Sequence, residues 1–174
     1  MRRVPSLDRE LTGDDTRFLE RALELAEVAL AAGQEPFGAV VVDRDGQQIG
    51  EGGNSVRADL DPTAHGEVVA IRDAWRRSGS WDALAGGTVY SNCEPCLSCS
   101  FVILQARITR VVFAAYGTDV PGFRPPLGGG ITVVAAWVAA QPDWPPLEVE
   151  GGLMREPAVE TLRAHELTRP ELDV

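Results

Sequence analysis

The sequence predicts an α/β layered domain in which part of the sheet is parallel. Helical stretches alternate with short β-branched runs, 44% of the 174 residues are hydrophobic, and no repeat or low-complexity linker divides the chain. A chain of this length buries a sizeable core without disulfides, so we expect one domain over residues 1–174 with a core at about 14–167. Right-handed crossovers between parallel strands would place helices on both faces of the sheet.

The first half of the chain predicts a helix, a hairpin and a second helix. Residues 14–32 repeat apolar side chains at helical spacing and begin with acids, which suit the positive end of the helix dipole. Residues 36–42 form a β-branched run that precedes a turn at 45–46 and another extended stretch, a pattern typical of a hairpin. Asp61 and Pro62 then predict a helix start, with Asp61 as the N-cap.

The second half continues the alternation. A strand is expected at 88–91, a helix opened by proline at 95–107, and another strand at 110–115. The region 121–148 is rich in proline, glycine and tryptophan around one apolar helical piece, and we interpret it as an insertion or lid. Helical periodicity returns at 156–167.

The charge balance bears on the partners of the protein. Sixteen Lys and Arg against 26 Asp and Glu give a formal net charge of −10, which disfavours phosphate backbones and anionic membranes. Neither an apolar run long enough to span a membrane nor an apolar signal core is present, so a cytoplasmic protein is expected. The three cysteines lie within seven residues, which is not the spacing of a disulfide framework.

Two clusters have the composition of a metal site: Thr-Ala-His-Gly-Glu at 63–67 and Asn-Cys-Glu-Pro-Cys-Leu-Ser-Cys at 92–99. Cys96 and Cys99 are three residues apart and share one face of a helix, so both thiolates can bind one ion. His65 can supply a third ligand from the neighbouring helix. Three protein ligands would leave one position of a tetrahedral Zn²⁺ open for water.

Glu67 supplies the proton chemistry that such a site needs. Zinc lowers the pKa of a water ligand to about 7, and a nearby carboxylate can then move protons. Because His65 and Glu67 are about 200° apart on an ideal helix, the metal must lie off the N-terminal end of that helix. The combination H-x-E and P-C-x-x-C is the signature of zinc nucleobase deaminases, in which the glutamate is general acid and base.

On these motifs the chain resembles the cytidine and deoxycytidylate deaminase superfamily, in its branch of guanine, cytosine and tRNA adenosine deaminases. The segments that carry the resemblance are PFGAVVV at 36–42, DPTAHGEVVAIRDA at 61–74, TVYSNCEPCLSC at 88–99, RVVFAA at 110–115 and EGGLMREPAVETLRAH at 150–165. The resemblance implies a three-layer α/β/α fold with a five-stranded mixed sheet. It also implies Zn²⁺ as cofactor and assembly as a homodimer.

The same resemblance implies substrate contacts. Asn54 would hydrogen-bond the base, the backbone N–H of Gly66 would contact it, and the carbonyl of Glu94 would help to place the leaving amine. Asn54 could instead serve only its turn, and Phe37 could stack on the base or belong to the core. An acid from the C-terminal segment often joins the site in this family, and three are available: Glu166, Glu171 and Asp173.

One departure leaves the substrate open. Guanine deaminases carry acids after the Gly-Phe pair that follows Thr-Asp, whereas here Gly122 and Phe123 precede Arg124, Pro125 and Pro126. We therefore predict a zinc-dependent hydrolase that releases ammonia from a free nucleobase or small aminoheterocycle such as guanine, cytosine or a triazine. The negative charge favours this over the alternative of a tRNA adenosine deaminase. A nucleoside deaminase is a further alternative.

Three hypotheses in which the cysteine cluster does not serve deamination remain open. A zinc-stabilised binding module would use Cys93 as a fourth ligand and leave no open position. A redox-active C-x-x-C pair would cycle between thiol and disulfide and hold no metal. The Cys93, Cys96 and Cys99 spacing also resembles the start of an iron–sulfur ligand run, but the chain has no fourth cysteine.

Overall fold

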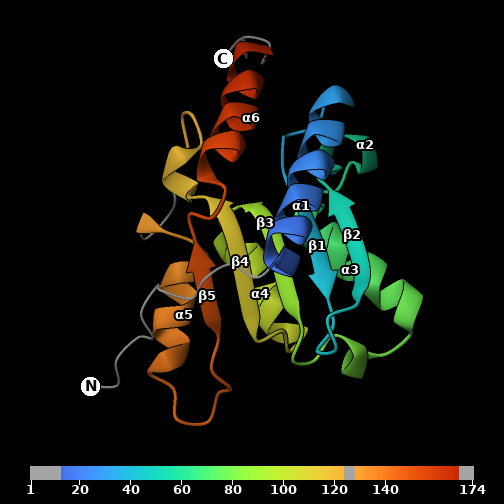
Figure 1. Cartoon of the computed structure of the whole chain (residues 1–174), viewed down its shortest axis with the longest axis vertical. Coiled ribbons are helices and arrows are strands. Elements are labelled where there is room, and N and C mark those ends of the chain that lie inside the picture. The colour runs from blue at the N-terminus through green and yellow to red at the C-terminus, as the bar shows by residue number, and fades with distance from the viewer. Residues whose placement is uncertain (1–12, 124–127, 169–174) are drawn as a thin grey trace.

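The chain folds into a mixed β-sheet between two layers of helices (Figure 1). This computed structural model describes residues 13–123 and 128–168, without the side chains of 165–168. The elements are α1 (Gly13–Ala31), β1 (Gly38–Val42), β2 (Gln48–Gly53), α2 (Val56–Asp59), α3 (Gly66–Ser78), η1 (Trp81–Ala83), β3 (Thr88–Cys93), α4 (Leu97–Gln105), β4 (Arg110–Ala115), η2 (Gly117–Asp119), α5 (Ile131–Ala139), β5 (Glu148–Gly151) and α6 (Arg155–Thr168).

The strand order is β2-β1-β3-β4-β5. Strand β1 is antiparallel to both β2 and β3, whereas β3, β4 and β5 run parallel. Cys93 at the end of β3 pairs with Ala115 at the end of β4, so the carboxyl ends of the two strands meet at one edge. The expected α/β fold with a five-stranded mixed sheet is confirmed.

Alternate residues of the central strands pack against different helix layers. In β4, Val111 and Phe113 belong to a core shared with α3 and α4, whereas Val112 packs with Phe18 of α1. Ala114 joins Leu162 of α6 in a third cluster. Because both faces of the central strands are buried, these strands are apolar throughout, as expected for a parallel sheet between helices.

Helix α3 lies unusually close to strand β2. A Cβ atom at Gly50 would lie 2.5 Å from the carbonyl oxygen of Ala70, and one at Gly52 would lie 2.6 Å from the side chain of Val69. Only glycine allows the helix to approach the strand at this distance. The two glycines therefore set the position of α3, and with it the residues at its N-terminus.

The predicted start of this helix at Asp61 and Pro62 is wrong, since α3 begins at Gly66. The Asp61 carboxylate accepts hydrogen bonds from the backbone N–H and the hydroxyl of Thr63, and Arg72 contacts it at 3.0 Å. These bonds stabilise a turn in place of the first helical turn, a common competing role for aspartate. The short helix α2 before this turn was not predicted.

Strand β5 was also absent from the expected elements. It is a four-residue edge strand with no fully buried residue, so its sequence has no apolar alternation to identify it. The apolar piece of the 121–148 region is helix α5, which contacts α4 and β5. Whether this region acts as a lid stays a prediction.

Candidate active site

The two predicted clusters lie side by side at the N-termini of α3 and α4. His65 is the N-cap of α3 and Cys96 is the N-cap of α4, and both have extended backbones, with φ −69° and ψ 155° at His65 and φ −66° and ψ 171° at Cys96. Because His65 is not yet helical, its side chain and that of Glu67 can point into the same site. The expectation that a metal would lie off the end of the helix agrees with this geometry.

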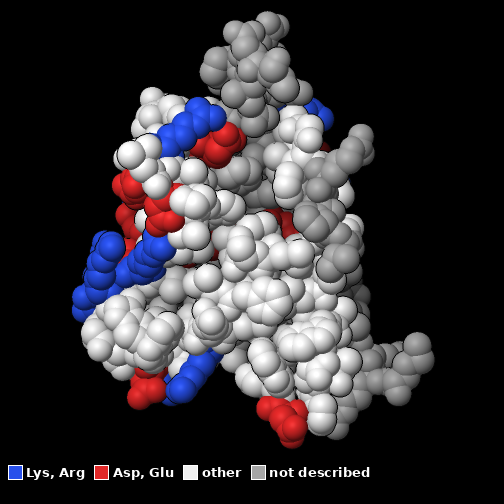
Figure 2. All heavy atoms as spheres, turned by 180° about the vertical axis from the view of Figure 1, so that it is seen from behind, with Lys and Arg blue, Asp and Glu red and all other residues white. Residues whose placement is uncertain are grey.

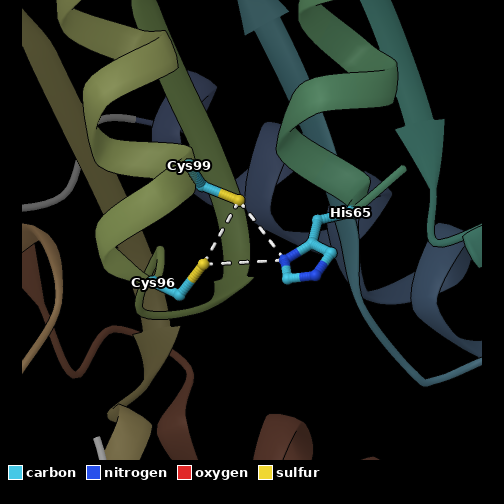
Figure 3. A group of neighbouring side chains, drawn as sticks. All are labelled: His65, Cys96 and Cys99. Atoms are coloured by element: carbon cyan, nitrogen blue, oxygen red, sulfur yellow. Dashed lines mark hydrogen bonds between the residues drawn. The ribbon is translucent and has the colours of Figure 1, made fainter. Parts of the chain in front are cut away.

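His65, Cys96 and Cys99 bring three ligand atoms together (Figure 3). The Nδ1 atom of His65 is 3.6 Å from Cys96 Sγ and 3.5 Å from Cys99 Sγ, and the two sulfurs are 3.5 Å apart. Tetrahedral zinc with ordinary bond lengths requires S···N edges of about 3.6 Å and an S···S edge of about 3.8 Å. The triangle of donors therefore fits three corners of a tetrahedral zinc site.

The two thiols of the triangle differ in how readily they lose a proton. Hydrogen bonds that the Cys96 sulfur accepts from the Cys99 thiol and the His65 ring lower the pKa of Cys96 well below its ordinary value. The pKa of Cys99 is raised, first because its proton is shared with Cys96 and second because it is buried. The contacts therefore favour the thiolate form of Cys96, and a bound dication would favour ionisation of Cys99 as well.

Glu67 is a buried carboxyl beside this triangle. Its side chain accepts a hydrogen bond from the Cys99 thiol at 3.4 Å. Burial raises the pKa of Glu67, and the negative charge of Cys96 raises it further. A carboxyl with a raised pKa can both donate and accept a proton near neutral pH, as a general acid and base requires.

A cavity of about 570 Å³ opens over this site. Six predicted site residues line it, namely Phe37, Asn54, His65, Glu67, Glu94 and Cys96, whereas Cys99 and Gly66 do not. Gly66 is the first residue of α3, where the N–H has no partner within the helix. A Cβ at this residue would lie 2.8 Å from the carbonyl oxygen of Phe37, so the close packing requires glycine.

Three of these residues have structural contacts as well as a place in the cavity. The Asn54 side chain accepts a hydrogen bond from the backbone N–H of Val56 at 3.2 Å, so it serves its turn and also faces the cavity. Phe37 packs against a buried cluster with Leu23. The Glu94 carboxylate accepts hydrogen bonds from backbone N–H groups of other segments, a role that its sequence motif does not indicate.

The cavity has walls that sequence analysis did not assign. Val120, Pro121, Gly122 and Phe123 form one wall after η2, and Leu162 reaches the cavity from α6. In the sequence, Gly122 and Phe123 stand out only as part of the departure from guanine deaminases. Leu162 is indicated only by the helical periodicity of 156–167. Arg124, Pro125 and Pro126, together with the candidate acids Glu171 and Asp173, lie outside the described residues, as does the side chain of Glu166.

Glu35 and Arg57 form an ion pair at the cavity. The guanidinium of Arg57 donates to the Glu35 carboxylate at 3.1 Å and to the carbonyl oxygen of Gly33 at 3.3 Å. No local sequence pattern indicates this pair, because its members are 22 residues apart. Part of the positive charge at the cavity is thereby neutralised.

Cys93 is separate from the metal triangle. It is buried, and its thiol donates a long hydrogen bond to the carbonyl oxygen of Tyr116 at 3.8 Å. Burial raises the pKa of Cys93, which stabilises the neutral thiol. Cys96 and Cys99 are not joined by a disulfide, since their sulfurs are 3.5 Å apart and a bond requires about 2.05 Å.

Within the described ranges no helix combines the length and the apolar character needed to cross a membrane.

Sequence comparison places residues 12–115 in the family described as the cytidine and deoxycytidylate deaminase zinc-binding region. A tRNA-specific adenosine deaminase of Haemophilus influenzae is 42% identical over 112 residues, which cover 63% of this chain and 64% of that protein. The guanine deaminase of Bacillus subtilis is 47% identical over 103 residues, covering 59% and 65%. The chain thus spans a little under two thirds of the length of these curated relatives.

Structure comparison gives the same two kinds of enzyme. A guanine deaminase from Nitrosomonas europaea superposes with a TM-score of 0.73 at 25% identity, covering 91% of this chain and 87% of that one. A tRNA:A34 deaminase superposes with a TM-score of 0.69 at 34% identity, covering 84% and 99%. The profile match over more than half of the chain, and the donor triangle at its centre, show that the protein belongs to the cytidine and deoxycytidylate deaminase family.

Proposed function

We propose that the protein is a zinc-dependent hydrolase that removes ammonia from a free nucleobase or a small aminoheterocycle such as guanine, cytosine or a triazine. The observation that carries the proposal is the buried Glu67 carboxyl next to three zinc-type ligand atoms at a cavity large enough for one heterocycle. His65, Cys96 and Cys99 would hold the Zn²⁺. The reaction would take place in the cytoplasm, where thiol ligands stay reduced.

The proposed mechanism assigns proton transfer to Glu67. Zinc in the site would supply Lewis acidity that activates water at neutral pH. Glu67 takes a proton from the attacking water and delivers it to the ring nitrogen as the water oxygen bonds to the amino-bearing carbon. It then takes the proton of the new hydroxyl group and passes it to the amino group, so that the C–N bond breaks, the ring carbonyl forms, and ammonia leaves. Since the carboxyl is buried, it stays in place through both transfers.

The residues that line the cavity would orient the substrate. Phe37 and Leu162 offer apolar surfaces to the faces of a flat ring, and Asn54 offers an amide to its polar edge. The Asn54 oxygen already accepts from Val56, so its Nδ2 group is the better placed to donate to a ring nitrogen or carbonyl. Gly66 N–H and the Glu94 carbonyl are the further proposed contacts.

Two substrate classes compete. The guanine deaminase superposition, which extends over 91% of the chain, supports a free base. The 42% identical relative supports a tRNA adenosine instead, while the net charge of −10 and the Arg57–Glu35 pair do not favour an RNA backbone. A nucleoside would be a third class of substrate, intermediate in size between a free base and a tRNA.

A substrate panel decides between them. Ammonia release should be measured from guanine, cytosine, adenine, their nucleosides, aminotriazines and an anticodon stem-loop RNA. Turnover of a free base supports the proposal. Turnover confined to nucleosides or to the RNA would overturn the substrate class but not the chemistry.

We also propose a homodimer that forms through α4 and α5. Neither helix contains a charged residue, and Phe101 and Trp137 are about half exposed on them. Figure 2 views the molecule from behind the sheet, and the middle of this face carries few charged side chains. An exposed apolar surface of this kind is typical of a protein interface.

Sedimentation velocity tests the dimer. The Phe101→Glu variant should sediment as a monomer, because it buries a charge in the proposed interface. The matched Val28→Glu variant, on the exposed surface of α1, should remain a dimer. A wild-type monomer, or a dimeric Phe101→Glu variant, would contradict this interface.

A further inference from the structure

Glu94 links three segments that are distant in sequence. Its carboxylate is buried and accepts hydrogen bonds from the backbone N–H groups of Gly117 at 3.1 Å, Gly130 at 3.0 Å and Thr132 at 3.3 Å. The hydroxyl of Thr132 donates a fourth bond at 2.5 Å. The carboxylate therefore joins the loop that carries Cys96 to the end of β4 and to the start of α5.

The start of α5 also contacts this loop directly. The N–H of Ile131 donates to the carbonyl oxygen of Pro95 at 2.9 Å. At Gly130 the approach is so close that a Cβ atom would lie 2.0 Å from the same oxygen and 3.2 Å from the Cα atom of Cys96. The backbone of a predicted zinc ligand therefore rests against α5.

Cys96 needs such support more than the other ligand on α4. Cys99 lies inside the helix and is fully buried, so the helix itself fixes its position. Cys96 is the N-cap, is partly exposed, and takes its position from residues 94–96. We propose that Glu94 and the N-terminus of α5 position Cys96 for metal binding, an inference that rests on the zinc site proposed above.

The proposal gives residues 129–139 a function. This segment supports the loop that carries Cys96 and does not close over the cavity as a lid. Glu94 and Thr132 are then positioning residues that act through Cys96. Groups that orient metal ligands in this way typically change metal affinity by about 10- to 100-fold when they are removed.

Cobalt binding tests the proposal without any substrate. Co²⁺ reports thiolate coordination through its absorption bands, and its affinity can be measured by competition with a chelator. Thr132→Val removes the hydroxyl while keeping the size of the side chain, and we expect it to weaken Co²⁺ binding about tenfold. Thr132→Ser keeps the hydroxyl and should bind within about twofold of wild type, because the hydrogen bond to Glu94 is retained.

Gly130→Ala gives an independent test through sterics. Its methyl group would collide with Pro95, push the ligand loop away from α5, and weaken Co²⁺ binding at least as much as Thr132→Val. If Gly130→Ala does not fold, as judged by circular dichroism, the two Thr132 variants decide the question.

Two results would overturn the proposal. One is wild-type Co²⁺ affinity in Thr132→Val, even with a lowered melting temperature, since the contact would then be structural only. The other is equal weakening in Thr132→Val and Thr132→Ser, which would exclude the hydrogen bond as the cause. A wild-type protein that binds Co²⁺ but deaminates no compound would instead refute the proposed function and leave this proposal standing.

Discussion

The two ends of strands β3 and β4 carry two very different clusters of ionisable groups. At the amino end, Arg110 bridges the buried Asp15 and Glu150, with the hydroxyl of Tyr90 donating to Asp15 at 2.7 Å. At the carboxyl end, the thiols and the carboxyl gather without any arginine or lysine among them. The amino-end cluster contains the Arg110 guanidinium as its cation, whereas the carboxyl-end cluster can accept a metal cation.

This difference shows how the same sheet serves stability at one end and chemistry at the other. At the amino end, both carboxylates lie within 3.1 Å of the Arg110 guanidinium, so each has a cation as its direct partner. At the carboxyl end, burial raises the pKa of Glu67 and the thiols share protons among themselves. Groups whose charges are not balanced within the protein are the ones available to a metal ion and to proton transfer.

The largest expected effect is at the carboxyl end. Glu67→Gln should lower the rate of ammonia release by about 10²- to 10⁴-fold, because the group that transfers protons is lost. The variant should still bind zinc and should unfold at the same temperature or higher, since a buried carboxyl is replaced by a neutral amide. Steady-state rates, metal content and thermal unfolding measure these outcomes.

Glu150→Gln at the amino end is the matched control. It alters a carboxyl of the other cluster and should leave the rate of the folded enzyme unchanged. Comparable rate losses in both variants would mean that the two ends are not functionally distinct.

The next effect concerns stability. Arg110→Met should lower the free energy of unfolding by about 3 kcal/mol, because the buried Asp15 carboxylate loses its cation. The folded variant should keep the wild-type rate when saturated with zinc. Urea unfolding, with rates measured on the same preparation, checks both statements.

Arg107→Met is the control for that measurement. Arg107 is largely exposed and lies 3.8 Å from the carboxylate of Asp82, so its loss should cost under about 1 kcal/mol. If both arginine variants had the same small effect, the amino-end cluster would not be a stabilising network.

The smallest effect is a pH dependence at η2, which contains Asp119. Hydrogen bonds from Arg155 hold the pKa of Asp119 below its ordinary value of 3.8. The folded state therefore binds this proton less readily than the unfolded state, and the stabilisation present above that value is lost as the pH falls through the folded pKa. Because Arg155 is half exposed, the contribution should be below about 1 kcal/mol.

The Asp119→Asn variant tests whether folding lowers the pKa of Asp119. The difference in unfolding free energy between wild type and the variant should be greatest near neutral pH and should shrink under acidic conditions. A difference that grew as the pH fell would show that the pKa of Asp119 is raised on folding instead.

Much of the fold could be predicted because its signals are local. The helical periodicity of α1, the β-branched run of β1 and the apolar run of β4 each need only a few adjacent residues. The misplaced start of α3 and the overlooked β5 had a different origin. At Asp61, hydrogen bonds from Thr63 and the ion pair with Arg72 replaced the expected helical turn, whereas β5 forms only because it pairs with the distant strand β4.

By itself, the sequence determined which residue types could bind zinc and transfer protons, because thiols three residues apart and the H-x-E motif are local patterns. The tertiary structure decided how these groups meet, since His65 and Cys99 are 34 residues apart and the packing of α3 and α4 on the sheet brings them within 3.5 Å. It also decided the cavity walls at Val120 and Leu162 and the support of Cys96 by α5. Such contacts form between segments whose spacing in sequence carries no information about their distance in space.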